Sequence, residues 1–292
     1  MTTAADLQSG KGHRGENFPV ASFFIRKEHR PVILAFYRFA RAADDVADHP
    51  TATADEKLHL LDEMGRTLMG ELDSAPEALA LRRVLEERKL SAQHGLMLLE
   101  AFRRDVTKLR YANWDELMDY CRYSAMPVGR FVLDVHGESR DTWPANDALC
   151  AALQVINHLQ DCGKDYRALN RIYIPQDAMT SAGVRIEDFG SERASPALRR
   201  VISEIARKTK ALLDEARPFA GLVRNARLGF EIATIQRLAE DLAIRLMHSD
   251  PLCDTVHHTK ADLVRLLPGA AARFVRARVS RDKRRLALRH SP

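Results

Sequence analysis

A polar stripe on an otherwise apolar helix is the feature that most constrains how this chain can fold. In the segment YRFARAADDVAD, residues 37–48, Tyr37, Arg41, Asp44 and Asp48 follow one another at steps of four, three and four. This spacing places them along one side of an α-helix. The other positions are mostly apolar, and a helix that is apolar around most of its circumference is usually buried. The chain is therefore expected to carry charge into its interior.

The carboxylates of this stripe repel one another, and burial strengthens the repulsion. A cation should therefore lie between them. The DDxxD pattern of Asp44, Asp45 and Asp48 taken alone is also compatible with a solvated acidic face near a helix end, because acidic pairs one turn apart are common.

A second helix repeats this design more than a hundred residues later. Its polar residues follow steps of three, four and four on a helix predicted from about Asn146 to Tyr166; they are Gln154, Asn157, Asp161 and Asp165. If the two stripes face each other, carboxylates and amides surround a cavity. Oxygen ligands of this kind suit Mg²⁺, whereas Zn²⁺ is disfavoured because the stripes contain neither His nor Cys. His158 lies off the stripe and is expected to be a packed or edge histidine.

The segment YCRYSAMPVG, residues 120–129, is expected to interrupt a helix at Pro127 and Gly129. A kink there would present Tyr120 and small residues to a bulky apolar ligand. A plain joint between two helices explains the same pattern equally well.

The composition favours helix almost throughout. Gly and Pro are sparse in the 292 residues, and no alternation of period two is long enough to indicate a sheet. Thr53, Asn113 and Ser195 are expected N-caps. We predict an all-α fold in one domain, residues 18–268, after a flexible leader, residues 1–17. The GxGxxG match in that leader lacks the preceding strand that a nucleotide site needs.

The chain ends in a basic segment, residues 269–292. From Ala271 onward it holds eight Lys or Arg and one Asp. Its alternation of Arg with apolar residues could rest on an anionic bilayer, and a disordered solvated tail explains the charge as well. The four cysteines show no CxxC spacing, and neither a signal peptide nor a membrane-spanning run is found. These features indicate a cytoplasmic protein, with any membrane contact peripheral and on the inner surface.

Taken together, these segments resemble the head-to-head trans-isoprenyl diphosphate synthases, the squalene and phytoene synthase family. YRFARAADDVAD, YCRYSAMPVG and QVINHLQDCGKDY followed by RIYIP stand in the family's order between about Phe18 and Leu246. The resemblance implies an isoprenoid-synthase-type helical bundle around a central cavity. It also implies an isoprenoid diphosphate substrate, and Mg²⁺ held by two aspartate-rich motifs.

Carried over residue by residue, the resemblance implies three sets of site residues. The metal ligands would be Asp44, Asp45, Asp48, Asp161 and Asp165. The substrate-binding residues would be Ser22, Phe23, Arg41, Gln154, Asn157 and Arg171. The catalytic residues would be Tyr37, Arg41 and Tyr120.

Within the family, GENFPVAS and NHLQDCGKDY favour the bacterial branch of hopanoid and squalene biosynthesis that converts presqualene diphosphate and water to hydroxysqualene and diphosphate. Gln160 and His158 are candidates to place that water. NADPH is not expected, because no credible dinucleotide site is present. The alternatives are condensation of two farnesyl diphosphates to presqualene diphosphate, a phytoene-type synthase, or a non-catalytic helical scaffold with a basic tail. No nucleic-acid partner is expected, and the oligomeric state is left open.

Overall fold

The computed structural model describes residues 26–289, without the side chains of residue 280 and residues 282–289. Within this range the regular structure is helical, and β-type pairing is limited to one isolated bridge between Arg110 and Ile172. The predicted all-α class is therefore confirmed. The leader, residues 1–17, and the predicted site residues Ser22 and Phe23 lie outside the described part of the chain.

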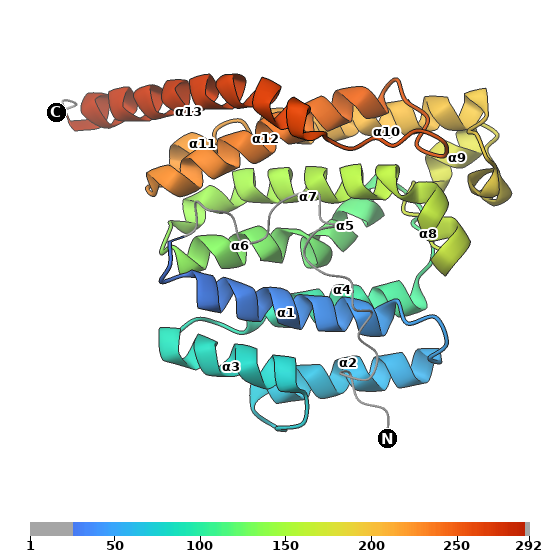
Figure 1. The fold of residues 1–292 in the computed structure, drawn as a ribbon, viewed down its shortest axis with the longest axis horizontal. Helices are drawn as coiled ribbons and strands as arrows, with labels where there is room; N and C mark the ends of the chain where they lie inside the picture. Colours follow the sequence, from blue (N-terminus) through green and yellow to red (C-terminus); the bar gives the residue numbers. More distant parts are fainter. Residues whose placement is uncertain (1–25, 290–292) are drawn as a thin grey trace.

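The helices stack in layers, as Figure 1 shows. At one end lie α2 and α3, then α1 and α4, then α5, α6 and α7, with α10 to α13 at the opposite end. The first eight helices are α1 (Arg30–Ala47), α2 (Ala54–Met69), α3 (Pro76–Arg88), α4 (Gln93–Thr107), α5 (Trp114–Ser124), α6 (Met126–Val135), α7 (Trp143–Gln160) and α8 (Cys162–Leu169). The later α-helices are α9 (Gln176–Ser181), α10 (Pro196–Glu215), α11 (Phe219–Leu222), α12 (Ala226–Leu246) and α13 (Lys260–Arg289). The 3₁₀ turns η3 (Arg140–Thr142) and η4 (Ile186–Gly190) lie between them.

Local sequence signals explain most helix starts. Thr53 forms a capping box with Glu56, and the side chains of Asn113 and Ser195 cap α5 and α10 as predicted. The single long helix predicted from Asn146 to Tyr166 is wrong, because Asp161 (φ −98°, ψ 6°) separates α7 from α8. Gly163 follows the break, where a Cβ would lie 2.7 Å from Leu252, so close packing requires a residue that weakens the helix.

Buried apolar side chains form two clusters. One consists mainly of residues from α1 to α4, and the other runs from α5 to α12. Phe131 of α6 belongs to the first cluster, where its ring stacks on Phe36 with centroids 3.9 Å apart. The layers that contain α1 and α4 thus meet the layer of α5 to α7 along a seam between the clusters.

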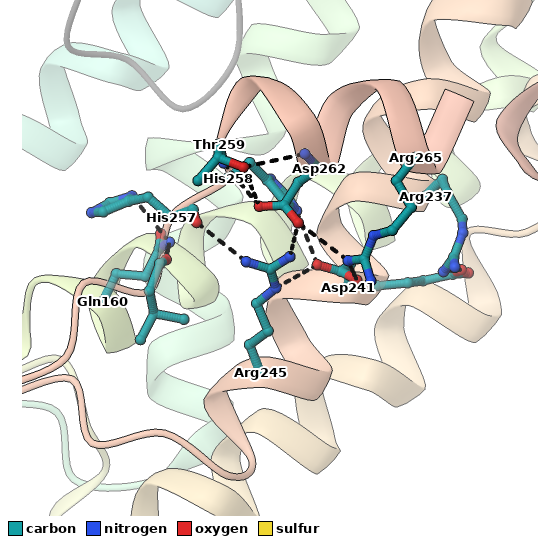
Figure 2. A network of polar contacts seen from close by, with 11 residues as sticks. Gln160, Arg237, Asp241, Arg245, His257, His258, Thr259, Asp262 and Arg265 are labelled. Atoms are coloured by element: carbon teal, nitrogen blue, oxygen red, sulfur yellow. Dashed lines mark hydrogen bonds and ion pairs between the residues drawn. The ribbon is translucent and has the colours of Figure 1, made fainter. Parts of the chain in front are cut away.

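The last helix packs along α12, and Arg273 binds Glu240 through two hydrogen bonds of 2.6 and 2.7 Å. The segment expected as a basic tail therefore continues α13 as far as Arg289. Figure 2 shows the ion pairs at its start, where Arg245 binds Asp241 and Asp262, each at 2.6 Å. These contacts fix the beginning of α13 to α12.

The end of α7 is bound to the segment that connects α12 to α13. The side-chain amide of Gln160 donates a hydrogen bond to the backbone oxygen of Val256, in the connection between α12 and α13 (Figure 2). Gln160 thus has a structural role at the outer edge of the helix pair α7–α8.

Gly129 allows α6 to approach α7 closely. A Cβ at this position would lie 2.0 Å from Asn146 Oδ1 and 2.6 Å from Cys150 Sγ. We expect Gly129→Ala to lower the free energy of unfolding by about 1–3 kcal/mol, because overpacking displaces α7. Denaturant unfolding followed by circular dichroism measures the change.

Gly65→Ala in α2 is the matched control. A Cβ there meets nothing closer than 3.4 Å, so the gain in helix propensity should leave stability equal or raise it by up to about 1 kcal/mol. A Gly129→Ala variant as stable as Gly65→Ala would show that the approach of α6 to α7 does not require glycine.

Candidate active site

A polar pocket of about 180 Å³ lies at the seam between the two apolar clusters. Its walls come from α1, α4, α5, α7, α8 and the segment that follows α8. The lining residues are Asp44, Asp48, Phe102, Asp105, Tyr120, Ser124, Gln154, His158, Asp165, Leu169, Arg171 and Tyr173. Each of the two predicted polar stripes therefore contributes two residues to one hollow, Asp44 and Asp48 from the first and Gln154 and Asp165 from the second.

The wall from α1 carries Asp44 and Asp48, which lie one turn apart. Arg41 binds Asp44 at 2.8 Å and Asp45 at 2.9 Å, so one guanidinium holds two neighbouring carboxylates. Asp45 is buried and does not line the pocket. The structure thus divides the first aspartate motif between the pocket and the α1 ion pair.

The facing wall carries Gln154 and His158 of α7 and Asp165 of α8. Asp161 occupies the break between these helices, its side chain is 42% exposed, and it lies 4.0 Å from Lys164. Asp161 is near enough to raise the pKa of Asp165 without lining the pocket itself.

The pocket carboxylates are held in an unfavourable environment. Burial, followed by repulsion from Asp48, raises the pKa of Asp44 to about 7. Burial, followed by repulsion from Asp161, raises the pKa of Asp165 to about 7, and Asp48 adds to this shift from the opposite wall. A cation in the pocket would relieve both effects.

Arg171 is the cation that the chain itself places in the pocket. Its Nη1 binds Asp48 at 2.5 Å, its Nε donates to the backbone oxygen of Asp105 at 2.9 Å, and its Nη2 donates to the backbone oxygen of Ala47 at 3.2 Å. Because these contacts join the end of α1 to α4, Arg171 fixes the spacing of two pocket walls.

Asp105 was missed by the sequence reasoning. It accepts hydrogen bonds of 2.8 Å from the hydroxyls of both Tyr120 and Tyr173, and burial raises its pKa to about 6. The sequence does contain a sign of its burial: Leu98, Ala101 and Asp105 are spaced by three and four residues, which places Asp105 on the buried face of α4. An acidic residue on such a face requires an explanation.

The other predicted site residues differ in whether they line the pocket. Tyr120, Gln154 and Arg171 line the pocket with the three carboxylates. The predicted residues that do not line it are Tyr37, Arg41, Asp45, Asn157 and Asp161. Lining residues that were not among the predicted site residues are Phe102, Asp105, Ser124, His158, Leu169 and Tyr173. His158 is packed, as expected, and also faces the pocket.

The donor chemistry of the pocket fits a hard divalent cation, because Asp44, Asp48 and Asp165 offer carboxylate oxygens, and Arg171 is the one arginine among the described residues that lines the pocket with them. Over residues 26–289, no three His, Cys, Asp or Glu side chains are placed to enclose one metal ion. Mg²⁺ is a cation that keeps several waters and completes its shell with phosphate oxygens, so it does not need to be enclosed by protein ligands alone.

Comparison with known proteins identifies relatives along most of the chain. A family model described as squalene/phytoene synthase matches residues 12–265. The hydroxysqualene synthase of Zymomonas mobilis is 58% identical, over 92% of this chain and 91% of the relative. The hydroxysqualene synthase of Rhodopseudomonas palustris is 54% identical over 88% of each chain. A solved squalene synthase from Alicyclobacillus acidocaldarius is 34% identical with a TM-score of 0.70, and the match covers 83% of this chain and 91% of that one.

The raised carboxylate pKa values predict how stability depends on pH. The folded state keeps Asp44 protonated up to about pH 7, whereas an unfolded Asp loses its proton near 3.8, so stability falls as the pH rises between these values. We expect Asp44→Asn to raise the melting temperature in metal-free buffer, by more at pH 8 than at pH 5. Thermal unfolding at both pH values tests this.

Asp115→Asn, at an exposed position in the first turn of α5, is the control and should show no such difference between pH 5 and pH 8. A lower melting temperature of Asp44→Asn at pH 8 would mean that its ion pair with Arg41 outweighs burial and repulsion.

Proposed function

Because the chain belongs to the squalene/phytoene synthase family, we propose that it is an isoprenoid diphosphate enzyme that converts presqualene diphosphate and water to hydroxysqualene and diphosphate. The similarity to bacterial hydroxysqualene synthases along nine tenths of the chain carries this proposal. The polar pocket supports it independently, since its walls combine carboxylates, an arginine and aromatic rings.

The size of the pocket indicates which part of the substrate it takes. At about 180 Å³ it is smaller than the 300–1,000 Å³ of typical pockets for whole organic ligands. It suits a diphosphate with its counterions. We assign the pocket to the leaving-group end of the substrate.

Mg²⁺ would be held by Asp44 and Asp48 from α1 and Asp165 from α8, with Asp45 and Asp161 next to them. When bound, it supplies positive charge that offsets the charge growing on the departing diphosphate. Arg171 adds a fixed positive charge in the same pocket, and Arg41 orients Asp44. Gln154 is a neutral hydrogen-bonding group for phosphate oxygens or their bound waters.

Departure of diphosphate leaves a carbocation, which the aromatic residues of the pocket can stabilise. Tyr120 and Tyr173 line it, and the π-face of an aromatic ring attracts positive charge. Their hydroxyls are engaged by Asp105, which fixes the ring positions. The overall reaction adds water without reduction, so we expect no requirement for NADPH.

The decisive experiment supplies purified protein and Mg²⁺ with presqualene diphosphate or farnesyl diphosphate in separate reactions, each with and without NADPH. We expect hydroxysqualene from presqualene diphosphate alone, unchanged by NADPH, as measured by gas chromatography and mass spectrometry. Turnover of farnesyl diphosphate only would instead assign the condensation step.

Substitution of the pocket carboxylates tests whether they act in catalysis. We expect Asp44→Asn and Asp165→Asn each to lower kcat/KM by roughly 100-fold or more, because a charge that stabilises the departing diphosphate is lost. Asp115→Asn is the matched control and should retain activity. Unchanged activity of folded Asp44→Asn and Asp165→Asn would favour the non-catalytic scaffold.

A peripheral membrane contact through α13 is a further part of the proposal. Val264, Val275 and Val279 are separated by eleven and four residues, which places them on one side of the helix, and they are 70%, 59% and 49% exposed. Arg265 and Arg276 are exposed nearby. An exposed apolar face bordered by arginine fits an anionic bilayer surface. In the described part of the chain, no helix has the length and apolar character needed to cross a membrane.

Vesicle co-sedimentation tests this contact. We expect binding to vesicles of phosphatidylcholine and phosphatidylglycerol that weakens with salt, and little binding to phosphatidylcholine alone. Val275→Asp with Val279→Asp should weaken binding by at least about tenfold, because two side chains lose their apolar contact. Met69→Asp, at another exposed apolar position on α2, is the control. Equal binding of both variants would exclude this face of α13.

A further inference from the structure

Two polar atoms in the pocket are buried without a hydrogen-bond partner among the described residues. They are Nε2 of His158 on α7 and Oγ of Ser124 at the end of α5. His158 is only 8% exposed. Buried polar atoms in folded proteins are nearly always paired with protein or with ordered water. Two unpaired atoms in one polar hollow therefore indicate a bound water or a polar group of the ligand.

The imidazole of His158 is held rigidly. It stacks on Tyr173 with ring centroids 3.5 Å apart and planes inclined by 13°, and the Tyr120 ring lies 5.9 Å away. The hydroxyls of both tyrosines donate to Asp105, so neither is free to donate to a water elsewhere. His158 Nε2 and Ser124 Oγ are the pocket-lining atoms that are buried without a hydrogen-bond partner among the described residues.

Burial, followed by repulsion from Arg171, lowers the pKa of His158 to about 3. The ring is therefore neutral near pH 7, with one nitrogen that donates and one that accepts a hydrogen bond. A serine hydroxyl can both donate and accept. Together the two side chains can bind a water molecule and leave an oxygen lone pair available.

We propose that His158 and Ser124 hold the water molecule that captures the carbocation. This inference rests on the proposed function and adds to it the residues that choose water addition over loss of a proton. Gln160, the other candidate, does not line the pocket, and its side-chain amide donates to the backbone oxygen of Val256.

The step balances without a further reactant. The carbon–oxygen bond to diphosphate breaks and its electron pair leaves with the diphosphate, after which the cyclopropane ring opens. The lone pair of the held water forms the new carbon–oxygen bond. The proton that this water loses ends on the released diphosphate. Without a held water, the same cation would lose a proton from a neighbouring carbon and form a hydrocarbon.

The test measures hydroxysqualene formed per diphosphate released from presqualene diphosphate. We expect His158→Leu and Ser124→Ala to continue releasing diphosphate while this ratio falls, by at least about tenfold for His158→Leu, as for the loss of one well-placed hydrogen bond. Hydrocarbon products should replace the alcohol. His158→Gln, which retains a hydrogen-bonding group, should restore much of the ratio.

Asp115→Asn, at an exposed position of α5 that does not line the pocket, is the control and should keep the wild-type ratio. An unchanged ratio in both His158→Leu and Ser124→Ala overturns the inference. If His158→Leu fails to fold, the ratio in Ser124→Ala decides, where a fall supports the inference and no change overturns it. Wild-type protein that forms no hydroxysqualene from presqualene diphosphate would instead refute the proposed function.

Discussion

Repulsion among the carboxylates that line the pocket is the constraint on which the rest of this structure depends. Asp44, Asp48 and Asp165 reach one hollow from two helices, and burial with mutual repulsion raises the pKa of Asp44 and of Asp165 to about 7. Such an arrangement costs stability unless something in the fold holds the walls together. Arg171 does so, because it binds Asp48 and two backbone oxygens on α1 and α4. The two apolar clusters therefore meet at a polar seam, where the pocket is lined by more aspartates than arginines. A ligand that brings divalent cations with it would supply the missing charge.

Each polar stripe could be predicted from the sequence because helical periodicity is a local property, whereas the facing of the two stripes was implied by the family resemblance. Asp44 and Asp48 share a side of α1, and Gln154 shares the pocket with Asp165 as its spacing indicates. The prediction from periodicity was wrong at Asp161, which was expected on the polar stripe of one continuous helix. The backbone leaves helical geometry there, and the Asp161 side chain lies 4.0 Å from Lys164. Periodicity places Asp105 on the buried face of α4, but it does not indicate the hydrogen bond between Asp105 and Tyr173, which lie 68 residues apart in the chain. Contacts of that kind depend on how helices pack, and a single sequence does not state them.

Asp105 organises the aromatic part of the site. By accepting hydrogen bonds from Tyr120 and Tyr173, it satisfies two buried hydroxyls and removes them from competition for water. The Tyr173 ring is stacked against His158, whose Nε2 is unpaired among the described residues, and against Tyr111. Water in a cavity that forms carbocations is a hazard unless it is held in one place. In the proposed reaction, the pocket would separate three tasks, which are binding of diphosphate, stabilisation of positive carbon and placement of one water.

The second aspartate motif is positioned from outside the pocket as well as from within it. Gln160 precedes the break at Asp161 and binds Val256, and Gly163 follows the break and packs against Leu252. Both contacts belong to the connection between α12 and α13, which Arg245 fixes through Asp241 and Asp262 (Figure 2). The start of α8, and with it Asp165, therefore depends on where α13 begins. Because the exposed apolar face of α13 lies on this same helix, a surface that binds α13 would act on the rigid element that supports the pocket wall. The proposed membrane-facing helix and the α8 side of the pocket are thus connected through the segment between α12 and α13.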